Sequence, residues 1–569
     1  MVRSLKVCCA VVVSVLAVSS NPQTSMGQAQ RGGLPVDRLP ANTYLYFAWH
    51  GQAALLKGDP NNNLVKLWND PDFLSLRKML SQSLAGSGSA ASDKSLPQAD
   101  QDAILDVLGG AGVIGAAGTF DLASLFAPGT AAKTKDSDFF MIWDASGKEA
   151  QWKRVDQLFA SRATDKPTTT SMTLRGVQAT RAETSSRVSF SGMAGTWRIE
   201  AGRQALFEDL VSRFQGSGGG AGLGQGALYQ AGMKFRAEAP VAEFALKMPA
   251  FNAAAGPQAG PFDIQAVLKA MHIDRLQGLV GSVGLSGTGT LMRTAVVGDT
   301  SAGSIFDLWG TSSTTFGTLS AAPVGYSYSG TKIDLGAFYR TVRNALQTSL
   351  PPDQFSSLEM VEGMVAAQTQ MPLVDLLSQI EEFATVSPLD AIATDLDKVM
   401  FAVRIKRPAD LLALIRKTIG SELSSDTTEA GITYLTMAGP TAMNIAIGPQ
   451  LLVVAPSKDV AKQAMTRAAA GGTQPGSLAA DAGFKQSRAL FPAALTSLSY
   501  SDMSKFPWQA MFNTMGAAIP SQAKPDAASS RTAEEMLQML PKLLSRYLHA
   551  TSSASWKAAG GIFAEVRVQ

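Results

Sequence analysis

The feature that most constrains the fold is a string of predicted elements that occurs twice, about 255 residues apart. Each copy is predicted to form a strand, a helix, a hairpin, a second helix and a strand, followed by a further helix and a glycine-turned hairpin. The first copy spans residues 139 to 246 and the second spans residues 399 to 500. The interval between the last two strands is 47 residues in one copy and 46 in the other. Chance rarely gives such agreement, so the pattern predicts a diverged tandem duplication.

The length of the chain agrees with two domains. At 569 residues it is too long for one hydrophobic core, because such cores stop growing at about 250 to 300 residues. We predict a first domain over residues 39–310 and a second over residues 311–569, with the boundary in the linker at 310 to 316. Hairpins interleaved with helices favour an α+β architecture over a doubly wound parallel sheet, so each domain is expected to be an antiparallel sheet with helices packed on it.

The first 19 residues have the proportions of an export signal. Arg3 and Lys6 form a basic start, and an apolar run of 12 residues, from 7 to 18, follows. The run is shorter than the roughly 20 residues that span a bilayer, so a cleaved signal peptide is favoured over a retained anchor. We therefore expect an exported protein, periplasmic or extracellular.

The mature chain is expected to contain no cysteine. Cleavage after Ser19 and cleavage after Ala29 both fit the signal, and residues 20–38 form a flexible leader. Either cut removes Cys8 and Cys9, the only cysteines of the chain. Disulfides, thiolate metal sites and cysteine nucleophiles are then excluded.

The charge of the chain gives no indication of a nucleic-acid partner. Loss of Arg3 and Lys6 lowers the net charge from +3 to +1, which supplies no large field for nucleic acid or anionic lipid. No later segment has the apolar length of a transmembrane helix. The partner that we expect is an unidentified envelope or extracellular component.

Several helix ends and loops are marked by the sequence. Asp70 before Pro71 and Ser457 before residue 458 are predicted N-caps, and a capping box predicts a helix start at Thr532. A helix is also expected at residues 264 to 271, and the glycine-rich stretch 216 to 226 is expected to be a loop.

Two short segments resemble an exported bacterial family known only as domain of unknown function 3352. Residues 39 to 43, Leu-Pro-Ala-Asn-Thr, match its opening Leu-Pro-Ala-Asp-Thr strand except at Asn42. Residues 451 to 465 match a strand-to-helix element of the family. The resemblance implies an envelope location and a repeated domain, and it implies no catalytic residue.

A search for catalytic and metal-binding motifs finds none that is complete. His50, His272 and His549 are separated, without the spacing that places two imidazoles on one metal, so structural roles are favoured for all three. Ser75 and Lys78 fit the Ser-x-x-Lys pattern of penicillin-recognising enzymes, but the partner motifs of those enzymes are missing. No metal ligand, cofactor or catalytic residue is predicted.

Other polar and aromatic groups are also better explained by structure. The acidic groups lack the glycine turn and terminal glutamate of a calcium loop; they are Asp93, Asp100, Asp102 and Asp106, and Asp390, Asp395 and Asp397. The tryptophans are expected to be core anchors, although several along an exposed groove would indicate a glycan or peptide site; they are Trp68, Trp143, Trp152, Trp197, Trp309, Trp508 and Trp556.

The sequence therefore favours a non-enzymatic binding or scaffolding protein of the envelope. The alternative is a hydrolase whose acid and base residues are distant in sequence. A deep pocket with ionisable groups of shifted pKa would indicate the hydrolase, and a broad surface or sheet face would indicate the binding protein.

Overall fold

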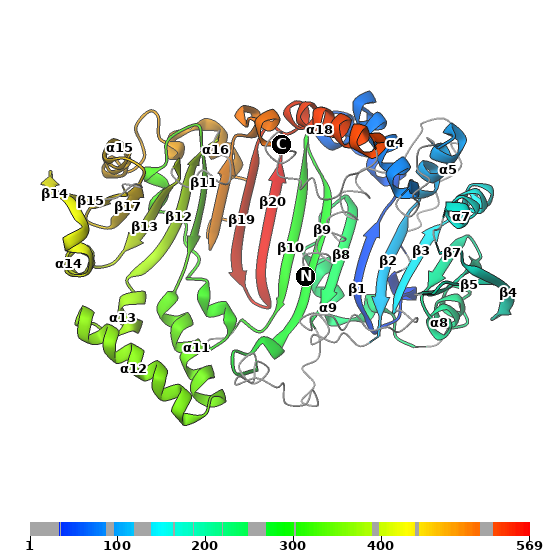
Figure 1. Cartoon of the computed structure of the whole chain (residues 1–569), viewed down its shortest axis with the longest axis horizontal. Helices are drawn as coiled ribbons and strands as arrows, with labels where there is room; N and C mark the ends of the chain where they lie inside the picture. Colours follow the sequence, from blue (N-terminus) through cyan, green and yellow to red (C-terminus); the bar gives the residue numbers. More distant parts are fainter. Residues whose placement is uncertain are drawn as a thin grey trace. The chain divides into compact units, whose positions relative to one another are not determined.

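A computed structural model describes residues 34, 36–86, 96–118, 138–162, 165–185, 187–218, 220–248, 269–300, 303–389, 398–437, 443–512 and 527–569. These residues form an α+β structure of antiparallel sheet and helices, as predicted (Figure 1). The predicted signal segment, both cleavage sites, both cysteines and most of the predicted helix at 264 to 271 lie outside the described residues.

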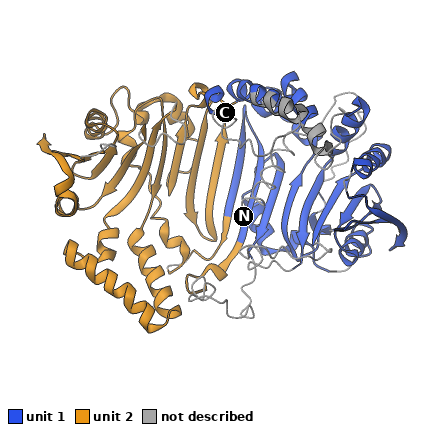
Figure 2. Ribbon diagram, viewed as in Figure 1, with its two compact units in different colours: residues 1–249, 278–295, 508–547 blue, residues 250–277, 296–507, 548–569 orange. Residues whose placement is uncertain are grey.

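The chain divides into two compact units that interleave along the sequence (Figure 2). Unit 1 comprises residues 1–249, 278–295 and 508–547, and unit 2 comprises residues 250–277, 296–507 and 548–569. The boundary predicted at 310 to 316 lies inside unit 2. The predicted boundary separates the two copies of the sequence repeat. The compact units are defined by spatial contacts, which join segments that are distant in sequence.

The sheet of unit 1 has the strand order β4-β5-β6-β7-β3-β2-β1-β8-β9-β10. Its strands are β1 (Thr43–Trp49), β2 (Gly112–Ala117), β3 (Phe139–Asp144), β4 (Thr168–Leu174), β5 (Val177–Glu183), β6 (Val188–Ala194), β7 (Trp197–Ala201), β8 (Pro240–Lys247), β9 (Leu276–Ser286) and β10 (Gly289–Gly298). The predicted hairpin of β9 and β10 is present, with Gly287 in its turn at φ 55°.

The sheet of unit 2 has the same order, β14-β15-β16-β17-β13-β12-β11-β18-β19-β20. Its strands are β11 (Tyr326–Lys332), β12 (Ile380–Pro388), β13 (Met400–Ile405), β14 (Leu423–Glu429), β15 (Ile432–Met437), β16 (Asn444–Ile447), β17 (Leu451–Ala455), β18 (Ser497–Ser501), β19 (Thr551–Ala558) and β20 (Gly561–Val568). Isolated bridges also correspond, Pro40 with Gly222 in unit 1 and Pro323 with Ser477 in unit 2. The two sheets share one connectivity, as the predicted duplication requires.

Helices lie between these strands in sequence, and α18, which follows β18, packs in unit 1. In unit 1 they are α2 (Gln52–Leu56), α3 (Asn63–Asn69), α4 (Pro71–Gly86), α5 (Gln98–Leu108), α7 (Glu149–Arg162), α8 (Gln204–Phe214), α9 (Ala227–Lys234) and α18 (Ala527–Tyr547). In unit 2 they are α11 (Leu335–Ser349), α12 (Pro352–Thr369), α13 (Leu373–Leu377), α14 (Pro408–Ile419), α15 (Lys458–Ala469) and α16 (Ala482–Arg488). Short 3-10 helices include η1 (Val36–Arg38) and η2 (Leu223–Gln225) in unit 1 and η5 (Thr318–Ala321) in unit 2.

The predicted helix caps agree with the structure in two cases and differ in one. The side chain of Asp70 accepts a hydrogen bond from the Asp72 amide at 2.8 Å, and that of Ser457 accepts one from the Val460 amide at 3.2 Å. The start predicted at Thr532 is wrong, because α18 begins five residues earlier, at Ala527. A capping box does not prevent the residues before it from being helical, so this motif alone does not determine where the helix begins.

The two faces of the unit 2 sheet have different surroundings. The inner face carries Tyr328, Leu498 and Tyr500, which pack in a core with α15 and α16. On the outer face, α14 packs against a second apolar cluster on β13, β15, β16 and β17. The strands β12, β11, β18 and β19 continue this outer face beyond that cluster.

Candidate functional site

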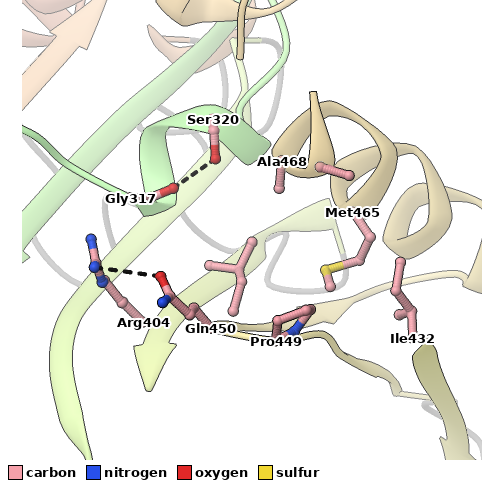
Figure 3. Close-up of a pocket in the computed structure, with 10 residues that line it drawn as sticks. Gly317, Ser320, Arg404, Ile432, Pro449, Gln450, Met465 and Ala468 are labelled. Atoms are coloured by element: carbon pink, nitrogen blue, oxygen red, sulfur yellow. Dashed lines mark hydrogen bonds between the residues drawn. The ribbon is translucent and has the colours of Figure 1, made fainter. Parts of the chain in front are cut away.

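The candidate site is a cavity of about 340 Å³ in unit 2, beside η5, α15 and the ends of β13 and β17 (Figure 3). Its lining residues are Gly317, Ser320, Arg404, Ile432, Pro449, Gln450, Leu451, Met465, Ala468 and Ala469. A volume of this size lies in the range of small-molecule sites in proteins, roughly 300 to 1,000 Å³. The cavity is therefore large enough for a small ligand.

One side of the cavity is polar. Nη2 of Arg404 donates to Oε1 of Gln450 at 3.5 Å, and Nε of Arg404 lies 3.2 Å from Oε2 of Glu381. The hydroxyl of Ser320 donates to the Gly317 carbonyl at 2.7 Å. A methyl group at position 317 would lie 3.1 Å from Nη1 of Arg404, so glycine lets η5 come this close to the guanidinium. The cation is thus held in place and partly neutralised.

The opposite side of the cavity is apolar. Figure 3 shows Ile432 and Met465 across the cavity from Arg404 and Gln450, with Ala468 above them on α15. The thioether of methionine adapts its shape to what it contacts. The cavity therefore has the polarity of a site for an amphipathic molecule.

The cavity reflects a difference between the two copies of the repeat. Helices α8 and α15 both follow a residue of extended backbone, Arg203 in unit 1 and Ser457 in unit 2. Counted from those residues, three large side chains of α8 correspond to three alanines of α15. They are Phe207, Leu210 and Phe214 in unit 1 and Ala461, Ala464 and Ala468 in unit 2, and of these alanines Ala468 lines the cavity.

In unit 1 the place that corresponds to Ala468 is filled by an aromatic ring. Phe214 is buried, and its ring meets that of Trp197 edge-on with centroids 5.6 Å apart. The guanidinium of Arg38 lies 5.7 Å from the centroid of the same ring. Unit 2 lacks this side-chain volume, which is why we treat its cavity as a candidate site.

The lining residues allow binding but supply no acid or base for catalysis. Among the described residues that line the cavity, none is an aspartate, glutamate, histidine, lysine, cysteine or tyrosine. General acid–base catalysis needs such a group within hydrogen-bond reach of the substrate. The arrangement can orient a polar group and enclose an apolar one.

One cluster of ionisable groups in unit 1 includes tyrosines with raised pKa values, but there is no room for a substrate beside it. Glu243 of β8 is 4% exposed and contacts Arg236, while Nε2 of His50 lies 3.4 Å from its Oε1. The rings of Tyr46 and Tyr229 lie next to this cluster, 6.2 Å apart. The void between these residues is about 20 Å³, enough for about one water molecule.

Burial keeps the two tyrosines of this cluster protonated at high pH, which gives a testable pH dependence. Burial, reinforced by the charge of Glu243, raises the pKa of Tyr229 to about 12 and that of Tyr46 well above its ordinary value. In the unfolded chain both phenols ionise near pH 10. The stability of unit 1 is therefore expected to fall as the pH rises above about 10.

The Tyr229→Phe variant is expected to show a smaller alkaline loss of stability than the wild type. Denaturant unfolding at pH values between about 9 and 11.5 measures it. Tyr326→Phe, in unit 2, serves as the control for the removal of one phenol. Equal slopes for wild type and Tyr229→Phe would show that this tyrosine does not couple folding to pH.

The three histidines and the Ser-x-x-Lys pattern do not come together in the structure. His50 pairs with Glu243, His272 has a left-handed backbone at φ 57°, and His549 is exposed. The Ser75 hydroxyl donates to the Pro71 carbonyl at 3.0 Å within α4, as an ordinary helical serine does. Neither group forms a site with the cavity residues.

The acidic groups and tryptophans are found in structural settings. Asp100 pairs with Arg154 at 2.5 Å and Asp106 pairs with Lys148 at 3.3 Å, whereas Asp93, Asp390, Asp395 and Asp397 lie outside the described residues. Within the described ranges, no group of three or more metal-binding side chains is found. Of the tryptophans predicted to be core anchors, Trp68, Trp143, Trp152 and Trp508 are buried, whereas Trp197, Trp309 and Trp556 are half-buried.

Sequence reasoning missed the cavity, although one signal was present. An alignment of the two copies would have set the alanines of residues 458 to 469 against the large residues of 204 to 214. It would not have placed Arg404 beside Gln450, because their contact depends on the pairing of β13 with β17. The described part of the glycine-rich stretch is a loop apart from η2, and α9, which follows it, was not predicted.

Comparison with known proteins leaves the family open. No family model matches the chain, and no curated protein matches it. Among solved structures, crystal forms I and III of TP0453 align with TM-scores of 0.23 and 0.24, at 10% identity. Each alignment covers 48% of this chain and 81% or 82% of the other. Scores this low establish neither a shared fold nor a shared function. No helix in the described part of the chain has the length and apolar character needed to cross a membrane.

Proposed function

We propose that this protein is an exported, non-enzymatic binding protein in which unit 2 takes up a small amphipathic ligand. The proposal rests on a comparison of the cavity in unit 2 with the tyrosine cluster in unit 1. The cavity with room for a ligand has no acid or base, and the cluster with raised tyrosine pKa values has room for about one water. A hydrolase needs both in one place.

Export of the chain and its likeness to domain of unknown function 3352 belong to the same proposal. The basic start and the apolar run of 12 residues support removal of residues 1–19, or 1–29, on the way to the periplasm or the exterior. An envelope or extracellular component is then the source of the ligand. The low net charge supports a partner other than nucleic acid.

The ligand is expected to have an apolar body and a hydrogen-bond acceptor at one end. Arg404 and the amide of Gln450 can donate to a carboxylate, sulfonate or carbonyl oxygen. Ile432, Leu451 and Met465 would cover the apolar part. Anilinonaphthalene sulfonate (ANS), with its aromatic rings and one anionic group, is a suitable probe.

The Ala468→Phe variant is expected to bind ANS at least about tenfold more weakly than the wild type, a loss of about 1.4 kcal/mol. The added ring would occupy the place that Phe214 fills in unit 1. The experiment is a fluorescence titration of the mature chain, whose first residue is determined by sequencing. The control, Thr466→Phe, adds the same ring at an exposed position of α15. An Ala468→Phe variant that melts like the wild type and binds ANS with equal affinity would overturn the proposal.

A further inference from the structure

The outer face of unit 2 carries a regular array of hydroxyl groups on four neighbouring strands, which we call the hydroxyl face. Strand registers place its twelve positions in three rows across β12, β11, β18 and β19. The rows are Ser387, Ser327, Ser501 and Thr551; Thr385, Ser329, Ser499 and Ser553; and Phe383, Thr331, Ser497 and Ser555. Eleven of the twelve side chains bear a hydroxyl, and none is charged.

Some of these hydroxyls form hydrogen bonds with one another, and they can still donate or accept further hydrogen bonds. Ser327 pairs with Ser501 at 2.6 Å, and Ser329 pairs with Ser499 at 2.9 Å. Each hydroxyl has one donor and two acceptor sites, so one bond leaves others available. Ser329 is exposed and most of the other positions are partly exposed. The face therefore presents unfilled donors and acceptors at fixed spacings.

Neither strand propensity nor solubility explains this composition. Serine, the commonest residue of the array, buries little apolar area and its side chain competes with the backbone for hydrogen bonds. Charged side chains are the usual means of keeping an open sheet soluble, and the array has none. In unit 1 the corresponding strands β1, β8 and β9 carry apolar side chains on that face: Leu45, Phe47, Phe244, Leu246 and Leu279. The hydroxyls are thus a property of the second copy.

An exposed aromatic ring lies at one border of the array. Phe383 is 38% exposed, and its ring stacks on that of Phe401 with centroids 5.9 Å apart and planes at 30°. Phe383 stands in the same row as Thr331 and Ser497. Stacking supplies apolar contact for a ring-shaped group that approaches beside the hydroxyls.

We propose that the hydroxyl face binds a neutral polysaccharide. Sugar rings offer hydroxyls in a repeating array and an apolar face that stacks on aromatic rings. Strand spacing repeats the protein hydroxyls about every 4.8 Å across the sheet and about every 6.8 Å along each strand, so successive sugars can meet equivalent groups. Nucleic acids and anionic lipids require cations, which the array lacks. A protein partner would call for an apolar centre, which the array also lacks.

The test is retardation of the mature chain in native gels that contain dextran, amylose, hydroxyethylcellulose or galactomannan, with sedimentation on insoluble cellulose and chitin. At least one of these neutral polysaccharides is expected to retain the wild type. The Ser329→Glu/Ser499→Glu variant is expected to lose at least about tenfold in affinity. Phe383→Ala, which changes a side chain at the border, is expected to weaken binding without disturbing the sheet.

Matched controls separate the hydroxyl face from the rest of the chain. Phe159→Ala removes an aromatic side chain of similar exposure, 44%, from α7, and Ser171→Glu adds charge to the exposed strand β4. Both are expected to bind like the wild type, as is Ala468→Phe, because the cavity lies elsewhere. Failure of every polysaccharide to retain the wild type, or wild-type binding by Phe383→Ala and the double variant, would overturn the inference. A change in self-association alone, measured by sedimentation velocity, would likewise assign the face to a second copy and refute the polysaccharide.

Discussion

Replacement of Glu382 by alanine is expected to lower the free energy of unfolding of unit 2 by about 3 to 5 kcal/mol, the range for breaking a buried ion pair. Glu382 is completely buried and receives four hydrogen bonds. Its carboxylate accepts from the amides of Gly317 and Thr318 at 3.0 and 2.8 Å, and from the Thr318 hydroxyl and the Lys332 ammonium. The variant leaves a buried cation and two amides without their acceptor.

The neighbouring Glu381→Ala variant is the matched control. Glu381 is 37% exposed and pairs with Arg404, so its loss is expected to cost less than about 1 kcal/mol. Denaturant unfolding measures both variants, and amide hydrogen exchange shows whether η5 opens first. Since η5 forms one wall of the cavity, Glu382→Ala is also expected to weaken ANS binding. A loss of stability no larger than that of Glu381→Ala would show that this network is not what holds η5 to the sheet.

The repeat and the fold class could be predicted because both depend on local patterns. Strand periodicity, caps and turn glycines act over a few residues, and two copies with the same intervals reinforce each other. The same patterns say nothing about which helix packs where. Helix α18 follows strand β18 in sequence but packs with α3 and α4, where Tyr547 donates to Asp70 at 2.6 Å. That contact joins residues 477 apart, beyond the reach of any local pattern.

The two candidate sites could not be predicted from the sequence. Alternate hydroxyls at residues 497, 499 and 501 were visible as a strand with two different faces. What could not be seen is that β11 and β19 lie on either side of β18 with the same alternation, since registers depend on the whole sheet. The cavity is harder still, because it arises from side chain volume that unit 2 lacks. A search for sequence motifs finds residues that are present, and it cannot detect a cavity that arises because large side chains are absent.

A second large effect is expected in unit 1, around the buried Trp68. This residue is 1% exposed, and its ring centroid lies 5.9 Å from that of Trp49 and 5.8 Å from that of Phe73. The guanidinium of Arg77 lies 4.5 Å from the Trp68 ring and donates to its carbonyl at 3.2 Å. Arg77 is 3% exposed, and burial lowers its pKa to about 10. Its Nε and Nη1 have no hydrogen-bond partner among the described residues, so the aromatic rings are its main compensation.

Trp68→Ala is therefore expected to destabilise unit 1 by about 4 to 6 kcal/mol. The cavity left by the ring accounts for about 3 to 5 kcal/mol, and the rest comes from loss of the cation–π contact with the buried Arg77. Trp68→Phe keeps an aromatic face and is expected to cost less, and Phe159→Ala controls for removal of an exposed ring. Denaturant unfolding of the single variants and of Trp68→Ala/Arg77→Met measures the coupling. The double variant is expected to be more stable than the sum of the single changes predicts, since methionine leaves no charge to solvate. Additivity within about 0.5 kcal/mol would mean that Trp68 does not stabilise Arg77, and that the loss in Trp68→Ala comes from packing alone.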